Sequence, residues 1–406
     1  MSFSSLGLSQ PLISTIAKLD YRAPTPIQKE AIPHVLAHHD IMARAQTGTG
    51  KTAAFALPLL HLASAKPKES LTTLVLTPTR ELAQQVHASF VKYGDETELT
   101  IGLAYGGVSI NPQITALEQG VDILIATPGR LLDLLHKETI NLKTIKHLVF
   151  DEADRMLDMG FMPDINRILK VTPAERQTLL FSATFDDAIF KLSKTLLTKP
   201  KLIEIDERNT AAAQVEQRVY VVDEDRKREL TSHLIGSKNW QQVLIFTRTK
   251  QGADALAKEM CKDGIKTQSI HGDKSQGARE RALADFKENK TRALVATDVA
   301  ARGLDIDQLK YVINYELPYI AEDYIHRIGR TGRAGNQGLA ISLLSLGEEY
   351  LLEEVEAVLD ARLSQQWLPG YEPDLSKEAL PSKKNSRTAI NKRRKDRAYG
   401  RNKKKR

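Results

Sequence analysis

The feature that most constrains the fold of this chain is a series of short apolar runs, each followed by a polar cluster and a segment of helical periodicity. Such runs suit strands that are buried on both faces of a sheet. They are Leu74–Leu76, Ile123–Ile125, Leu148–Phe150, Leu179–Phe181, Val243–Phe246, Ala293–Ala296, Tyr311–Ile313 and Ala340–Leu344. Strands that alternate with helices predict the α/β class, with mostly parallel sheets flanked by helices.

The length of 406 residues exceeds what one compact core usually organises, so two domains are expected. A polar, small-residue segment without periodicity separates the two sets of runs and is predicted to be the linker. The predicted organisation is an N-terminal domain at 1–206, a linker at 207–214, a C-terminal domain at 215–365 and a disordered basic tail at 366–406.

Composition narrows the class of protein further. Hydrophobic residues make up 41% and charged residues 27% of the chain, as in globular proteins in solution. No apolar run approaches the roughly 20 residues that span a bilayer, so no membrane association is expected. The single cysteine, Cys261, fits a reducing compartment, and no Cys/His cluster indicates zinc. We therefore expect a cytoplasmic protein.

The net charge of +7 is concentrated at one end of the chain. Residues 377–406 contain 14 Lys and Arg against 2 Asp and Glu, a balance of +12, which leaves −5 on the other residues. This tail has almost nothing to bury, so disorder is expected. It either aids solubility as a solvated terminus or tethers a polyanion without sequence preference, and RNA, a ribosome or DNA would all fit.

Most of the apolar runs end in clusters rich in polar residues or glycine, among them "TPTRELA", "ATPGR", "DEAD", "SAT" and "TRTK". In open parallel sheets, ligands bind beyond the carboxyl ends of the strands. A polar cluster after one strand is explained by a helix cap, but such clusters after several strands indicate one shared binding edge.

The segment "AQTGTGKT" nearly fits the phosphate-loop pattern, with alanine where the first glycine usually stands. Backbone N–H groups of such a loop converge on phosphate oxygens at a helix N-terminus. Lys51 would supply charge to the β and γ phosphates of a nucleotide, and the Thr52 hydroxyl would bind Mg²⁺. The predicted nucleotide-binding loop is Ala45, Gln46, Thr47, Gly48, Thr49, Gly50, Lys51 and Thr52.

Three carboxylates, Asp151, Glu152 and Asp154, follow the run that ends at Phe150. Acids also favour the first turn of a helix, which is the plainer interpretation of this stretch taken alone. Beside a phosphate loop, Asp151 is expected to serve the Mg²⁺ and Glu152 to orient and deprotonate the attacking water. The loop and the acids together predict nucleotide hydrolysis.

The ordered motifs resemble those of the DEAD-box RNA helicases over roughly residues 1 to 360, and the tetrapeptide of residues 151–154 is literally DEAD. The resemblance implies that Gln28 of "PTPIQ" bonds the adenine edge and that Tyr21 stacks on the base. Asp20 stands where the family usually has glycine, which puts only the local turn in doubt. In "SAT", Ser182 and Thr184 would join Asp154 in coupling hydrolysis to unwinding.

The resemblance also implies two tandem RecA-like domains, of which only the first carries a phosphate loop. In "HRIGRTGR", Arg330 and Arg333 match the arginine fingers that reach the γ-phosphate across the cleft between the domains. Asp305 matches a ribose contact, and His326 matches a residue that ties the cleft to the acidic motif. The short architecture with a basic tail resembles bacterial RhlE-like members, a group associated with ribosome assembly and RNA decay.

The strand-gripping motifs of the family are matched in both halves. The residues implied to contact RNA are Arg80, Gly106, Gly107, Thr127, Gly129, Arg130, Arg248, Gly272, Gln276, Arg279 and Thr297. Such residues bond the phosphates and sugars of the strand, so they position it independently of its base sequence. Contacts to the 2′-OH distinguish RNA from DNA. Aromatic residues are only 6% of the chain, and no interleaved stacking platform is visible.

The predicted function is therefore an RNA-stimulated ATPase that locally unwinds short RNA duplexes, with single-stranded and short duplex RNA as partners. Ribosomal RNA or a ribonucleoprotein is the expected wider setting. The alternatives are an ATP-gated RNA clamp, a ribonucleoprotein remodeller without net unwinding, and a DNA translocase. No sustained heptad occurs between Glu348 and Leu375, so a monomer is expected.

Overall fold

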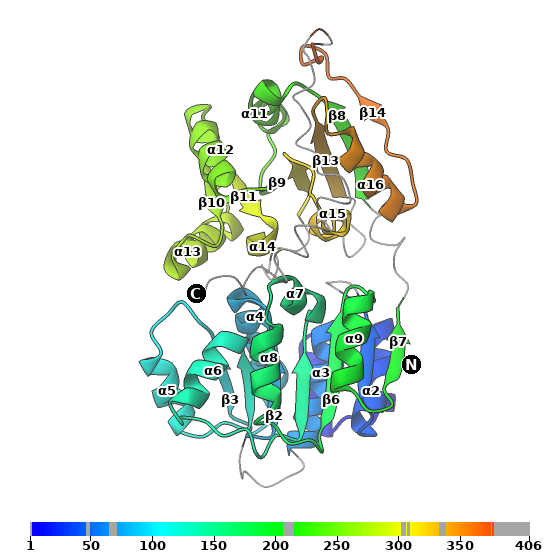
Figure 1. Ribbon diagram of the computed structural model, residues 1–406, viewed down its shortest axis with the longest axis vertical. Coiled ribbons are helices and arrows are strands. Elements are labelled where there is room, and N and C mark those ends of the chain that lie inside the picture. The colour runs from blue at the N-terminus through cyan, green and yellow to red at the C-terminus, as the bar shows by residue number, and fades with distance from the viewer. Residues whose placement is uncertain are drawn as a thin grey trace, which may run out of the picture. The chain divides into compact units, whose positions relative to one another are not determined.

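The computed structural model describes residues 2–45, 49–64, 71–205, 215–301, 306, 309–332, 338–374 and 376. Within these residues the chain forms two sheets that belong to two compact units, and each is described by itself (Figure 1). The linker predicted at 207–214 lies outside the described residues.

The first sheet has seven strands among the described residues, in the order β3-β4-β2-β5-β6-β1-β7, and all its described pairs are parallel. Each strand is extended and its carboxyl end lies at the same edge of the sheet as those of its neighbours. The strands are β1 (Ile41–Arg44), β2 (Thr73–Leu76), β3 (Ile101–Ala104), β4 (Ile123–Ala126), β5 (His147–Phe150), β6 (Gln177–Ser182) and β7 (Lys201–Glu204).

Helices cover both faces of the first sheet, because successive strand residues point to opposite sides. Val75 packs into one apolar cluster, with helices α1 to α4, whereas Leu74 and Leu76 pack into the other, with α6 to α9. Helices α8 and α9 lie on the near side in Figure 1. The helices are η1 (Phe3–Leu6), α1 (Gln10–Lys18), α2 (Pro26–Leu36), α3 (Lys51–Ser64), α4 (Arg80–Tyr93), α5 (Asn111–Glu118), α6 (Pro128–His136), α7 (Ala153–Asp158), α8 (Met162–Leu169) and α9 (Asp187–Leu196).

The second sheet has seven described strands in the order β10-β11-β9-β12-β13-β8-β14, again with parallel pairs throughout. Its strands are β8 (Val215–Val221), β9 (Val243–Thr247), β10 (Thr267–Ile270), β11 (Ala293–Thr297), β12 (Tyr311–Asn314), β13 (Gly338–Leu344) and β14 (Gln365–Gln366). The helices that alternate with them are η2 (Glu224–Arg226), α11 (Lys227–Ser237), α12 (Lys250–Lys262), α13 (Gln276–Lys287), α14 (Asp298–Ala301), α15 (Ala321–Ile328) and α16 (Glu349–Leu359).

All eight apolar runs identified in the sequence form strands, which confirms the predicted α/β class. The strands that were not identified lie mostly toward the margins of the sheets or carry polar residues. β1 has the sequence "IMAR" and β10 "TQSI", so neither forms a continuous run of large apolar residues. Their strand conformation depends on partners that are distant in the sequence, as Met42 pairs with Leu180.

The disordered tail was predicted at 366–406, but the first residues of that range, after α16, pack against the second sheet. β14 pairs with β8, and Leu368 and Tyr371 pack against the apolar cluster of the second sheet. Arg226 donates a hydrogen bond of 2.6 Å to the carbonyl of Gly370 and lies 4.9 Å from the centroid of the Tyr371 ring. Residues 366–374 therefore belong to the second domain, and the prediction was wrong there because sparse aromatic anchors leave no periodic pattern.

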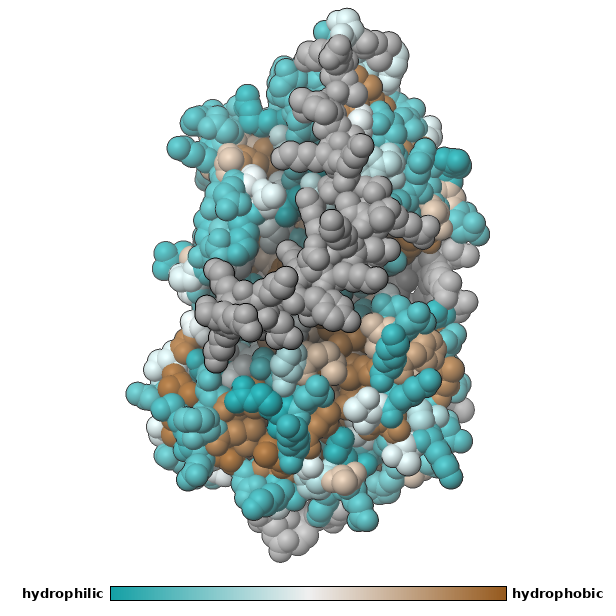
Figure 2. Space-filling view, in the orientation of Figure 1, coloured by the Kyte–Doolittle hydropathy of each residue, from teal (hydrophilic) through white to brown (hydrophobic). Residues whose placement is uncertain are grey.

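No helix among the described residues is long and apolar enough to cross a bilayer. Most of the surface in Figure 2 is hydrophilic, with apolar residues gathered over the helices on the near side of the first domain.

Candidate nucleotide and RNA site

The phosphate loop leaves β1 at Arg44 and enters α3 at Lys51, so its described residues lie at a strand end and a helix N-terminus. Gly50 has φ +91°, and a Cβ there would lie 2.4 Å from Nε2 of Gln28. Glycine is thus required both for the backbone conformation and for the close approach of Gln28. Ala45, Thr49, Gly50, Lys51 and Thr52 are described, whereas Gln46, Thr47 and Gly48 lie outside the described residues.

Three buried charged side chains converge on this strand-end region of the first domain. Nζ of Lys51, Oδ1 of Asp151 and Oε2 of Glu152 are each buried without a hydrogen-bond partner among the described residues. Buried charged atoms without partners are costly, so a native site that keeps them is built for a ligand. A lysine beside two carboxylates fits a phosphate group with a divalent cation, and the residues present are therefore suited to Mg²⁺ and ATP.

The DEAD segment is held in a strained turn. Glu152 has φ +55° and ψ +55°, the left-handed region that residues other than glycine enter at a cost of about 1 kcal/mol. Asp154 accepts a hydrogen bond of 3.3 Å from the backbone N–H of Ala183, in the SAT segment. The N–H of Ala45, at the start of the phosphate loop, donates to the carbonyl of Ser182 at 3.1 Å. The structure therefore links the loop, DEAD and SAT directly.

Burial raises the pKa of Asp151 to about 6, with Glu152 adding to the shift and Lys51 opposing it. Burial also raises the pKa of Asp154, and Arg155 opposes that shift. Asp151 and Asp154 are thus poorly suited to be ionised together, which is expected where a cation and cationic side chains complete the charge balance.

This raised pKa predicts how the stability of the ligand-free protein depends on pH. Between about pH 4 and pH 6 the folded state binds more protons at Asp151 than the unfolded chain does, so stability falls as pH rises through that window. The loss is on the order of 3 kcal/mol at most. Asp151→Asn should remove this dependence. Denaturant midpoints of wild type and variant, followed from about pH 4 to pH 8, should diverge as pH rises, and a constant difference would contradict the prediction.

The segment predicted to bind adenine is anchored to the first domain. Oε1 of Gln28 accepts from the N–H of Thr25 at 2.9 Å, and Nε2 donates to the carbonyl of Gly50 at 3.1 Å. Both ends of this amide are therefore engaged with the chain itself, and its contact with adenine stays a prediction. Asp20 has φ +56°, so the turn that glycine usually makes in the family is kept by an aspartate, which tolerates this region.

Tyr21 is placed to offer a ring to a base. It is 36% exposed, and its ring meets that of Tyr93 edge to face at 6.1 Å, with 3.3 Å between the two hydroxyl oxygens. One edge of the Tyr21 ring is thus fixed by α4, while the side chain stays accessible.

Tyr21→Ala is expected to raise the KM for ATP about tenfold, with a smaller effect on kcat, because a stacked aromatic pair contributes about 1 kcal/mol or more. Tyr21→Phe, which keeps the ring, should stay near wild type in steady-state ATPase assays. Equal KM values for Tyr21→Ala and wild type would show that the ring does not stack on the nucleotide.

Several residues predicted to grip RNA lie together in the first domain, because the neighbouring strands β3, β4 and β2 end at one edge. A Cβ on Gly107 (φ +79°) would lie 1.8 Å from Nη1 of Arg80, so the guanidinium rests directly on this glycine. Arg130 donates from Nη2 to the carbonyl of Val108 at 2.8 Å. Two arginines thus hold the loop that contains Gly106 and Gly107, with Thr127 and Gly129 at the start of α6.

A cavity of about 360 Å³ adjoins this loop and α6. It is lined by Val108, Ile110, Arg130, Asp133, His136 and Lys137. Nη1 of Arg130 is buried and has no hydrogen-bond partner in the described part of the chain, whereas Nε lies 3.7 Å from Oδ2 of Asp133. The Nη1 donor suits an anionic ligand, which agrees with the RNA contact predicted for Arg130.

In the second domain the predicted residues are spread over several strand ends. Arg248 follows β9, Gly272 follows β10, Gln276 and Arg279 lie on α13, and Thr297 ends β11. His326 lies on α15 and Arg330 follows it, both with polar or electrostatic partners. Arg333 and Asp305 lie outside the described residues. The roles of all these residues stay predictions.

Arg327, between His326 and Arg330, is a key residue that was not singled out in the sequence. It is 1% exposed and donates to both carboxylate oxygens of Asp298, at 2.6 and 2.8 Å. It also donates to Asn314 Oδ1 at 3.2 Å and to the carbonyl of Glu316 at 2.6 Å. Its position inside an arginine-rich motif was the available signal, but only the structure distinguishes this buried arginine from its neighbours.

These features define a phosphate-loop nucleotide-binding protein with two parallel α/β sheets. The family model described as DEAD/DEAH box helicase matches residues 25–192, and the model described as Helicase conserved C-terminal domain matches residues 226–335. The DEAD-box ATP-dependent RNA helicase RhpA of Helicobacter pylori is 42% identical over 368 residues, which are 91% of this chain and 74% of RhpA. The ATP-dependent RNA helicase CshA of Listeria monocytogenes is 41% identical over 370 residues, 91% of this chain and 71% of CshA.

Solved structures agree with these sequence matches. S. cerevisiae Dbp5 bound to RNA and ADP BeF3 has a TM-score of 0.81 and 32% identity, covering 90% of this chain and 95% of Dbp5. DEAD-box helicase Mss116 bound to ssRNA and UDP-BeF has a TM-score of 0.82 and 28% identity, covering 93% and 81%. This chain belongs to the DEAD-box ATP-dependent RNA helicase family, and its two sheets are tandem RecA-like domains.

Proposed function

We infer that this chain is an RNA-stimulated ATPase that uses ATP to unwind RNA, as its family membership indicates, and we propose that it separates short duplexes locally. The observation that carries the ATPase assignment is the set of buried, unpartnered charged atoms on Lys51, Asp151 and Glu152. Each would gain a partner from a nucleotide phosphate, a cation or the attacking water. RNA as the polymer is supported by relatives whose solved structures hold RNA and nucleotide analogues.

In the proposed mechanism, Thr52 and Asp151 would hold Mg²⁺, which would supply charge neutralisation to the phosphates when bound. Lys51 binds the terminal phosphates from the helix N-terminus. Glu152 orients the attacking water and accepts its proton, a role that its fixed, strained backbone favours. We propose that Arg330 and Arg333 stabilise the charge that develops on the γ-phosphate.

Coupling to RNA is proposed to run through the contacts that join the loop to DEAD and SAT. A change at the γ-phosphate alters Asp151 and Glu152, and Asp154 transmits it to Ala183 through their hydrogen bond. ATP and RNA would then strengthen each other's binding, since coupling between two sites is reciprocal.

A strand-separation assay tests the unwinding itself. Duplexes of about 10 base pairs should separate in an ATP-dependent reaction, whereas duplexes of about 30 should resist, because local separation opens only a few base pairs. The base pairs that remain each add to the barrier for strand separation. ATP-dependent retention of RNA without strand separation would instead favour the clamp.

The wider setting is proposed from the same chemistry. The basic residues at 377–406 would hold the enzyme near structured RNA, such as ribosomal RNA or a ribonucleoprotein, through contacts that do not depend on sequence. We propose a cytoplasmic monomer of the RhlE-like branch.

A further inference from the structure

Helix α6 of the first domain has one polar face. Side chains that are three or four residues apart lie on the same side of a helix. The residues of α6 and its C-terminal end with this spacing are Arg130, Asp133, His136 and Lys137. Leu131 and Leu134, between them, are fully buried in the core of the domain. The sequence of α6 therefore separates an apolar face that anchors the helix from a polar face that is not needed for packing.

This polar face lines the cavity of about 360 Å³, together with Val108 and Ile110 of the loop that follows β3. The volume is far larger than the roughly 30 Å³ that one water molecule occupies in the liquid. Cationic side chains beside two apolar ones suit a ligand that combines an anionic group with a carbon framework. A sugar–phosphate unit has both parts, whereas a simple inorganic anion would leave most of the cavity to water.

Arg130 contributes a buried donor to this cavity. The residue is 7% exposed, and its Nη2 donates to the carbonyl of Val108 at 2.8 Å. Its Nη1 is buried without a hydrogen-bond partner among the residues described. Asp133 lies 3.7 Å from Nε, too far for a hydrogen bond, and its side chain is 64% exposed, so water screens the pair. A buried guanidinium that keeps a free donor and most of its charge is costly without a ligand.

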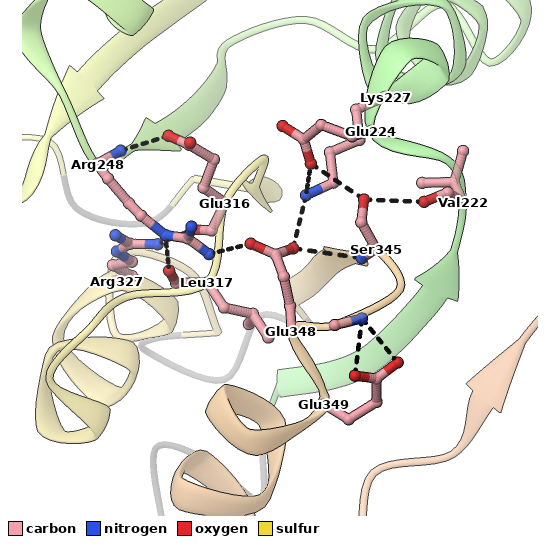
Figure 3. Close-up of polar contacts among 11 residues, drawn as sticks. Val222, Glu224, Lys227, Arg248, Glu316, Leu317, Arg327, Ser345, Glu348 and Glu349 are labelled. Atoms are coloured by element: carbon pink, nitrogen blue, oxygen red, sulfur yellow. Dashed lines mark hydrogen bonds and ion pairs between the residues drawn. The ribbon is translucent and has the colours of Figure 1, made fainter. Parts of the chain in front are cut away.

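Arg248, the arginine predicted to contact RNA from the second domain, shows the opposite arrangement (Figure 3). Its Nη2 pairs with Glu348, and its Nε donates to the carbonyl of Leu317 at 2.6 Å. Burial alone would raise the pKa of Glu348, but Lys227 and Arg248 outweigh it and lower the pKa, so the carboxylate is ionised. The charge of Arg248 is thus compensated within the protein, whereas that of Arg130 is not.

The charges that line the cavity favour an anion. Arg130 and Lys137 carry two positive charges against one negative charge on Asp133, a balance of +1, and His136 adds an imidazole N–H. Cations in the last turn of a helix also balance its dipole. That effect alone would not explain a buried arginine donor in the same cavity, seven residues before Lys137.

We propose that this cavity binds one sugar–phosphate unit of the RNA strand, with Nη1 of Arg130, the His136 ring and Nζ of Lys137 around its phosphate. Neither His136 nor Lys137 is among the residues that the family resemblance implies for RNA. The grip on the backbone therefore extends from the start of α6 to its C-terminal end. The proposal rests on the proposed function, since it presumes that RNA binds to this domain, and it requires no contact with a base.

Lys137→Ala in the full-length protein tests the site, with single-stranded RNA and a non-hydrolysable ATP analogue present. Affinity for RNA should fall about fivefold at roughly 0.1 M salt, and the slope of log affinity against log salt concentration should become shallower by about 0.7. Lys137→Arg should restore both quantities. The matched control is Lys143→Ala, which removes an exposed lysine of the loop after α6 that does not line the cavity. It should leave both near wild type.

RNAs with a single neutral methylphosphonate linkage locate the contact along the strand. In a set where each RNA carries this linkage at a different position, one member's weaker binding to wild type should disappear in Lys137→Ala. The weaker binding of the other members should persist, because only groups in contact show such coupling.

Asp133→Asn predicts an effect of opposite sign. It removes the one carboxylate that lines the cavity, so RNA should bind about two- to fivefold more tightly. Loss of the exposed pair with Arg130 would not tighten binding, so this result separates repulsion of a phosphate from a merely structural role of Asp133.

Three results would overturn the site. They are wild-type affinity and salt dependence in Lys137→Ala, an equal loss in Lys143→Ala, and a loss in Lys137→Ala that leaves every methylphosphonate penalty unchanged. If wild type shows no RNA-stimulated ATPase, the proposed function itself fails. If wild type is stimulated and any of the three results is found, the function stands and only the cavity's role is wrong.

Discussion

Glu152→Gln is expected to reduce RNA-stimulated ATP hydrolysis by about 10²- to 10⁴-fold, the range that positioned general bases contribute. The amide cannot accept the proton of the attacking water, yet it keeps the size and hydrogen-bonding reach of the carboxylate. Since Oε2 of Glu152 is buried without a partner, removing its charge should not destabilise the fold. The measurement is steady-state ATPase with saturating RNA, accompanied by the affinity for nucleotide.

The matched control is Asp158→Asn, at the end of helix α7, which begins directly after Glu152; Asp158 is half exposed and paired with Arg155 at 3.7 Å. It should hydrolyse ATP within about twofold of wild type. Nucleotide affinity of Glu152→Gln should remain near wild type, which separates a chemical role from a binding role. Retention of more than a tenth of the wild-type rate would contradict the assignment of Glu152.

Arg327→Ala is expected to destabilise the second domain by about 3–5 kcal/mol, the usual cost of removing one partner of a buried ion pair. The substitution leaves Asp298 without its bidentate partner and empties the space beside the Phe246 ring, whose centroid lies 5.0 Å from the guanidinium carbon. Both tryptophans, Trp240 and Trp367, lie in the second domain, so tryptophan fluorescence during denaturation reports on this domain alone.

The control for this prediction is Lys262→Ala, which removes an exposed ion pair with Glu259 and should cost less than about 1 kcal/mol. The double variant Arg327→Ala/Asp298→Ala should be less destabilised than the sum of its single variants, because the lone carboxylate is gone. If the denaturation midpoint of Arg327→Ala, followed by fluorescence, is no lower than that of Lys262→Ala, the buried pair contributes little to the stability of the second domain.

The fold was largely predictable because its strongest signals are local. Strands buried on both faces must be apolar at every position, so runs such as Leu148–Phe150 are visible without knowledge of their partners. β1 and β14 were not predicted, because β1 contains an arginine and β14 consists of two glutamines. Pairing across the sheet determines their conformation. The family motifs then implied two tandem domains, which the matching models and solved structures confirm.

The candidate site was predictable in part, for a similar reason. Lys51, Asp151 and Glu152 lie within motifs whose chemistry is readable from residue type and spacing. The contacts that hold them are not readable in this way: the bond from Gln28 to Gly50 joins residues in separate elements, and so does the pairing of Glu348 with Arg248. Such pairs depend on how strands are ordered in the sheet, which no local pattern records.

The most direct test of the central claim is steady-state ATPase activity measured with no polymer, with single-stranded RNA and with DNA of the same sequence. Full-length protein and a chain that ends at Asp374 should be compared, because the latter keeps the packed segment after β14 and loses the basic residues at 377–406. The account predicts stimulation by RNA alone that survives truncation. Equal stimulation by DNA, or hydrolysis indifferent to any polymer, would contradict it.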